Sequence, residues 1–257
     1  MLSAEQIQAN LEKFYAIIEK YIKEPRTTKL LALYQPQEEL LAFAPASSKA
    51  SFHNSFPGGY VDHVNRVIEC ALKQMTLWEE MGATINFTEE ELVFAALNHD
   101  LGKLGIGGKP RYIPNDSEWH IKNQGANYKP NAALPFLPVQ DNSLFILQSE
   151  GISVTLNEYI AIRIHDGLYD ESNKPYLISG QNESKLRTSL PYILHQADLM
   201  ASRIEWEKEW LGKVGEPAKA KEVKPAGPTQ YKQQAESKKL QQLAGSNQGL
   251  LNALKGI

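Results

Sequence analysis

The sequence contains a single cysteine, Cys70, among its 257 residues, so no intramolecular disulfide is available to it. It has no run of eighteen apolar residues, and its first twenty residues alternate charged and apolar side chains. These absences argue against membrane insertion and secretion. We therefore expect a cytoplasmic protein that folds without disulfides.

Three familiar binding motifs are also missing. The chain has no Walker phosphate loop, no glycine fingerprint for dinucleotides and no paired-cysteine metal knuckle. Its net charge of -3 is unevenly distributed, because residues 213–257 hold eight lysines and only three glutamates. Nucleic acid is therefore a candidate partner for this basic segment.

The apolar content of 42% suffices for one sizeable core. We expect N-terminal helices and a connecting loop in residues 1–57, packed on a main domain in residues 58–212. Residues 213–257 are rich in Lys, Ala, Pro, Gln and Ser, a composition that buries too little apolar surface to offset chain entropy. This segment is predicted to be a disordered Lys-rich tail.

Helical patterns dominate residues 1–212. Three capping boxes, Ser3 with Gln6, Thr88 with Glu91 and Thr155 with Glu158, each precede an apolar pattern of helical period. Further helices are predicted over residues 26–34, 60–81 and 189–210, and a short one over 117–126. Residues 35–57, 104–116 and 128–142 are predicted to be irregular. The fold class expected is an all-α bundle of about seven helices.

Five chemically capable side chains lie on or beside the apolar faces of separate predicted helices: His63, His99, Asp100, His165 and Asp198. Each of them alone is ordinary in a helical protein. Burying all of them without partners would cost several kcal/mol. A bound divalent cation removes this cost, because imidazole nitrogens and carboxylate oxygens are its usual ligands.

Two segments carry a family resemblance. Gly58-Gly59-Tyr60-Val61-Asp62-His63 is followed, 36 residues after the histidine, by Asn98-His99-Asp100-Leu101-Gly102-Lys103, and later by Asp198 in a predicted helix. This order of His, His-Asp and Asp resembles the HD superfamily of metal-dependent phosphohydrolases over roughly residues 58–205. The resemblance implies an HD-type helical bundle with a catalytic metal site.

The resemblance assigns the first metal to His63, His99, Asp100 and Asp198, with positions left open for water and a phosphate oxygen. Asp100 and Lys103 are then the expected catalytic residues, and Lys103 would contact the phosphate. Many relatives bind a second ion through two further histidines. His120 and His165 occupy that interval here, with His165 the better candidate because it ends a capped apolar helix.

Additional substrate contacts are expected from positive and imidazole side chains. Arg66, Lys109 and Arg111 are candidates for holding phosphate groups, since guanidinium and ammonium groups pair well with phosphate oxygens. His195 lies one turn before Asp198 and faces either the site or the core. His53, in a polar loop, is expected to be exposed to solvent or to substrate.

The expected function is hydrolysis of a phosphate ester or anhydride by metal-activated water, with a nucleotide as the expected substrate. One or two divalent ions, Mn, Fe, Ni, Co, Zn or Mg, suit the donor set, and the sequence does not select among them. Alternatives are a 3' exonuclease on RNA or single-stranded DNA aided by the basic tail, a di-iron oxygenase, and a metal-stabilised binding module. The oligomeric state is open.

Overall fold

The computed structural model describes residues 1–214, with side chains described as far as residue 208. Helices make up most of this part of the chain, so the all-α prediction is confirmed. The strands within it are β1 (Tyr112–Pro114) and β2 (Tyr128–Pro130), which pair antiparallel with Tyr112 opposite Pro130. Apart from its first two residues, the segment predicted as a tail, 213–257, lies outside the described residues.

The N-terminal helices are α1 (Ala4–Tyr21), α2 (Arg26–Tyr34) and α3 (Glu38–Phe43). The capping box of Ser3 and Gln6 opens α1 as predicted, and α2 has the predicted bounds. The α3 helix was not predicted, because it has only six residues, between a 3-10 turn and the loop that follows. Phe14 and Ile18 of α1 are fully buried and belong to the main core.

The central helices are α4 (Gly59–Glu80), α5 (Glu89–Asn98), α7 (Val139–Ser149), α8 (Leu156–Ile164) and α10 (Leu190–Val214). The capping boxes predicted at Thr88 and Thr155 are present at the starts of α5 and α8. Their buried apolar faces form one core together with the N-terminal helices. Cys70 of α4 is buried and unpaired, as the sequence suggests.

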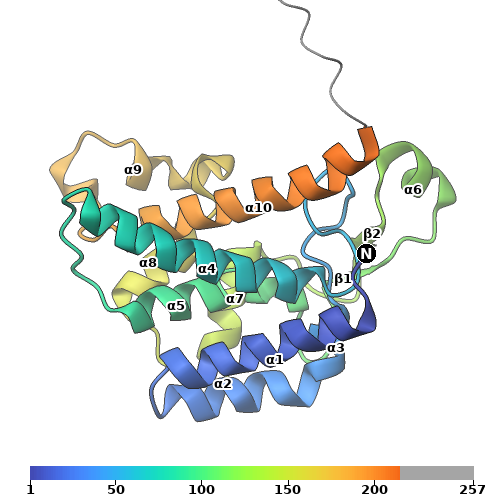
Figure 1. The fold of residues 1–257 in the computed structure, drawn as a ribbon, viewed down its shortest axis with the longest axis horizontal. Coiled ribbons are helices and arrows are strands. Elements are labelled where there is room, and N and C mark those ends of the chain that lie inside the picture. The colour runs from blue at the N-terminus through green and yellow to red at the C-terminus, as the bar shows by residue number, and fades with distance from the viewer. Residues whose placement is uncertain (215–257) are drawn as a thin grey trace, which may run out of the picture. The chain divides into compact units, whose positions relative to one another are not determined.

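Helices α4 and α10 run side by side and antiparallel, in teal and orange in Figure 1. Contacts along their length fix this direction. Near the start of α4, His63 meets Asp198 and Glu205 of α10. Near its end, the ring of Trp78 stacks on that of Tyr192 at 6.4 Å between centroids. The first two turns of α4 are therefore held against the middle of α10.

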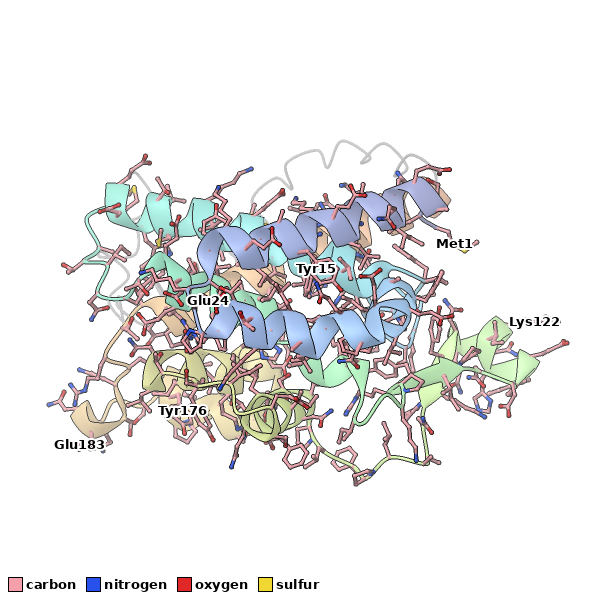
Figure 2. All side chains as sticks on the ribbon, turned by 90° about the horizontal axis from the view of Figure 1, so that it is seen from below. Met1, Tyr15, Glu24, Lys122, Tyr176 and Glu183 are labelled. Carbon is pink, nitrogen blue, oxygen red and sulfur yellow. The ribbon has the colours of Figure 1, made fainter. Side chains whose placement is uncertain are left out.

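Shorter elements connect these helices. They are α6 (Glu118–Gln124), α9 (Lys174–Leu177) and five 3-10 turns: Gln35–Gln37, Leu101–Leu104, Gly167–Tyr169, Glu171–Asn173 and Asn182–Ser184. Figure 2 places Lys122 of α6 at one end of the molecule and Tyr176 of α9 with Glu183 at the other. In Figure 1, α6 lies beside β2 and away from α9.

Residues Met1–Lys213 form one compact unit. Within it, α1 packs on α4 and α5, so residues 1–57 and 58–212 share a core. No helix in the described part of the chain is long and apolar enough to cross a bilayer.

Candidate metal centre

Three predicted histidines meet where three helices converge. His63 lies in the first turns of α4, while His99 and His165 directly follow α5 and α8. All three are buried, with at most 2% of each residue exposed. The Nδ1 atoms of His99 and His165 donate to the carbonyl oxygens of Ala96 and Ile162, at 2.7 and 2.8 Å. Each neutral ring therefore presents the lone pair of its Nε2 atom to the centre.

Two predicted aspartates complete the cluster. The Oδ2 atom of Asp100 lies 3.3 Å from His99 Nε2 and 3.6 Å from His63 Nε2, and its Oδ1 atom lies 3.6 Å from His165 Nε2. The Oδ1 atom of Asp198, on α10, lies 3.2 Å from His63 Nε2. Four helices thus bring the five predicted side chains to one point.

Lys103 contributes a positive charge at the same point. Its Nζ atom lies 2.5 Å from Asp100 Oδ2, and only 14% of the lysine side chain is exposed. The 3-10 turn after Asp100 creates this contact by placing Lys103 three residues on. Gly102 within the turn lies so close to α7 that an added Cβ atom would be 2.2 Å from the carbonyl oxygen of Val139. The glycine therefore lets this turn pack on α7.

The carboxylates control the protonation of the histidines. Burial disfavours a charged imidazole, but Glu205 and Asp198 outweigh it and raise the pKa of His63 to about 10. Asp166 and Asp100 outweigh burial in the same way and raise the pKa of His165 to about 9. Protons and a metal ion would therefore compete for the same nitrogen atoms.

Lys103 and the histidines act on the aspartates in the opposite sense. Burial alone would favour the protonated acid, yet Lys103 and His99 hold the pKa of Asp100 well below its usual range. Burial is likewise outweighed at Asp198, where the nearby His63, followed by His99, lowers the pKa. Both aspartates are therefore ionised at neutral pH and suited to bind a cation.

These residues fit a divalent metal ion. The side chains form groups whose potential ligand atoms lie within 4.8 Å of one another: His63, His99 and Asp198; His99, Asp100 and His165; and His165, Asp166 and Asp198. The Nε2 atoms of His63 and His99 are buried and make no hydrogen bond. Unsatisfied buried nitrogens cost free energy, and a cation among them would remove that cost. The cluster can therefore hold a metal ion.

A cavity of about 610 Å³ opens onto the cluster. Its walls come from the loop of residues 46–53, from the 166–169 turn and from α10, and they include Lys103, His195 and Asp198. This volume lies within the range of pockets that hold small molecules, about 300–1,000 Å³. Asp198 and Lys103 therefore line a site that is large enough for a small substrate.

The predicted substrate residues divide into two groups. Lys103 and His195 line the cavity, and His195 donates through Nδ1 to the carbonyl oxygen of His165 at 2.7 Å. Arg66, Lys109 and Arg111 do not line it. Arg66 is bonded instead to Asp62 and Glu205, and Arg111 donates to the carbonyl oxygen of Leu137.

His120 is not brought to the cluster. It lies on α6 with its side chain exposed, and its Nδ1 atom is 2.6 Å from the hydroxyl oxygen of Ser117, which caps that helix. Among the described residues it belongs to none of the groups that can hold a metal. The group that contains His165 and Asp198 has Asp166 as its third member, with Oδ1 at 3.6 Å from His165 Nε2.

One residue of the site was not predicted, and a second makes a contact beyond those expected of it. Glu205 of α10 bonds His63 Nδ1, and its place seven residues after Asp198, two helical turns on, is the signal that would have found it. His53 was expected to face solvent or substrate. Its ring stacks on that of His63 at 4.4 Å, and it lines the cavity. Burial, with the positive charges of His63 and Lys103, lowers its pKa to about 2.

The chain matches no protein-family model, no curated protein and no solved structure. A helical protein with a buried cluster of histidines and aspartates is compatible with an HD domain. The residues themselves therefore carry the functional argument.

Proposed function

We propose that this protein is a metal-dependent phosphohydrolase of the HD type, acting on a phosphate ester or anhydride, with a nucleotide as the expected substrate. One observation carries the proposal. His63, His99, Asp100 and Asp198, which come from distant parts of the sequence, lie in one cluster in which both aspartates are within 3.6 Å of His63 Nε2, beside the ammonium group of Lys103 and next to a cavity.

One or two divalent ions would be held by His63, His99, Asp100 and Asp198, with His165 and Asp166 as the further donors. Such an ion, when bound, lowers the pKa of coordinated water and neutralises charge on phosphoryl oxygens. The position of Asp100 supports a two-ion site, since its carboxylate offers two oxygen atoms, of which Oδ2 lies near His63 and His99 and Oδ1 near His165.

The chain's own residues orient the substrate. Lys103 donates from the base of the cavity to a phosphate oxygen, because its ammonium group is the buried cation nearest the cluster. His195 presents Nε2 to the cavity, since its Nδ1 atom is engaged by the carbonyl oxygen of His165. Gly167 allows this ring to approach: a Cβ there would lie 2.1 Å from His195 Cε1.

The test is a phosphate-release screen of the full chain with Mn, Co, Ni, Mg and Fe against nucleotides, cyclic nucleotides and short oligonucleotides. We expect metal-dependent hydrolysis that Asp100→Ala abolishes together with metal binding. Lys103→Met should keep the metal and lose turnover, while the exposed Lys109→Met should retain both. Full activity of the Asp100 variant would refute the mechanism.

Other products would identify the alternatives. Release of single nucleotides from the 3' end of oligonucleotides would establish the exonuclease. Bound iron with an oxygen-dependent product would establish the oxygenase. Ligand binding without turnover of any compound would establish the binding module.

A further inference from the structure

Glu205 is a buried acid that makes two short polar contacts. Only 2% of the residue is exposed. Its Oε2 atom lies 3.0 Å from His63 Nδ1, and its Oε1 atom lies 3.0 Å from Arg66 Nε. A carboxylate only accepts hydrogen bonds, so the hydrogen must be on Nδ1 of His63. The lone pair of a neutral His63 is then on Nε2, which faces Asp198 and Asp100.

His63 differs from the other two histidines in this respect. His99 and His165 each donate through Nδ1 to a carbonyl oxygen three residues earlier. Their ring orientation is therefore set within a single helix end. The ring of His63 is set from another helix, by a side chain of α10, and by a charged acceptor. Charged acceptors make stronger hydrogen bonds than neutral ones.

Further contacts hold Glu205 and extend to the cavity wall. Arg66 compensates the buried carboxylate and also bonds Asp62, with Nη2 to Oδ2 at 3.0 Å. Asp62 Oδ2 accepts in turn from Asn54 Nδ2 at 3.0 Å. Asn54 follows His53, whose ring stacks on His63. The acid is thus fixed by neighbours on α4 and by the loop that lines the cavity.

From these contacts we propose that Glu205 is a positioning residue, which fixes the tautomer and ring orientation of His63 for metal binding, with Arg66 holding Glu205 in place. The inference deepens the proposed function and rests on it. A carboxylate on the second nitrogen of a ligating histidine orients the ring and makes it a stronger ligand. Arg66 accordingly serves the metal centre rather than the substrate phosphate.

The experiment compares Glu205→Gln with wild type and with Glu207→Gln, which removes an exposed carboxylate from the same helix. Glutamine keeps the size of the side chain and removes its charge. Zn²⁺ affinity is measured by competition with a fluorescent chelator. The His63 tautomer is read from ¹⁵N chemical shifts of the Zn²⁺-loaded full chain. The melting temperature in excess chelator reports any structural damage.

We expect Glu205→Gln to weaken Zn²⁺ binding by about 10–100-fold, the usual effect of removing such a partner. The Nδ1–H tautomer signal of His63 should also weaken, with Glu207→Gln unchanged in both. Arg66→Met, which leaves Glu205 in place, should weaken affinity less and in the same direction. A lower melting temperature with unchanged affinity and tautomer would mean a purely structural acid and would overturn the inference.

The wild-type measurement separates this inference from the proposed function. If the wild-type chain binds Zn²⁺ and Glu205→Gln binds it equally tightly, the positioning role is wrong and the metal centre stands. If the wild-type chain binds no metal, the metal centre itself is refuted, and the positioning role falls with it.

Discussion

Replacing Lys103 with methionine tests the electrostatics of the cluster. The lysine ammonium lies 2.5 Å from Asp100 Oδ2, and the two side chains are 14% and 3% exposed. Removing one partner of a buried ion pair costs about 3–5 kcal/mol, because the other charge is left uncompensated. His99, His63 and His165 remain within 3.6 Å of Asp100. We therefore expect the lower end of this range, about 3 kcal/mol.

The assay is urea and thermal unfolding of Lys103→Met and wild type in the presence of a chelator. At about 2–4 °C per kcal/mol for a unit of this size, the melting temperature should fall by about 6–12 °C. Saturating Mn²⁺ should narrow the difference, because a cation beside Asp100 supplies the missing positive charge and stabilises the folded state through binding.

Lys122→Met is the matched control. Lys122 also pairs with an acid, Glu118, but the side chains are 74% and 85% exposed. Such surface pairs contribute about 0–1 kcal/mol, so this variant should unfold nearly as wild type does. A decrease in the unfolding free energy of Lys103→Met below about 1 kcal/mol in chelator, the value of a surface pair, would refute this prediction. An equal decrease with and without Mn²⁺ would also refute it.

Three further predictions concern other parts of the molecule. His120→Ala should keep wild-type metal content and turnover, because this histidine is exposed and outside the cluster; elemental analysis checks it, and loss of metal would contradict it. Gly102→Ala should lose about 1–3 kcal/mol in urea unfolding, since its Cβ would overlap the backbone of α7; unchanged stability would show that the contact is not tight. Burial opposes ionisation of Glu91, but bonds from Thr88 and Thr155 outweigh it and lower its pKa. The ionised Glu91 carboxylate therefore stabilises the fold above its ordinary pKa, and this stabilisation is lost as the pH falls through the pKa of the folded state. The Glu91→Gln variant should then be less stable than wild type at neutral pH and equally stable in acid. A difference in unfolding free energy that does not change with pH would exclude this origin.

The sequence predicts helices well where apolar spacing and caps agree. Thr88 and Thr155 each start a helix as expected, because a capping box satisfies two backbone groups locally. Helix α7 was not predicted, since it begins in a segment interpreted as an excursion. Its buried face carries Gln140, Asn142 and Ser143, and these polar side chains weaken the apolar period. They are buried because they bond other groups, as Ser143 does with the backbone of Gly102.

The candidate site was predictable where its residues follow a spaced pattern. His63, His99, Asp100, His165 and Asp198 are brought together as expected. His120 fitted the same order along the chain but lies on an exposed helix, a distinction that order alone does not contain. Glu205 and the loop carrying His53 depend on how α10 and residues 46–54 pack on α4. Apart from the helical spacing of Glu205 from Asp198, such tertiary contacts have no local signal in the sequence.

The most direct test of the metal centre is elemental analysis of the full chain after incubation with Mn²⁺ and removal of free metal, beside Asp100→Ala. Asp100 adjoins His63, His99 and His165, so its loss should disrupt the whole donor set. The metal centre predicts one or two equivalents of metal in the wild-type chain and little in the variant. A wild-type chain without metal, or a variant with equal content, would contradict it.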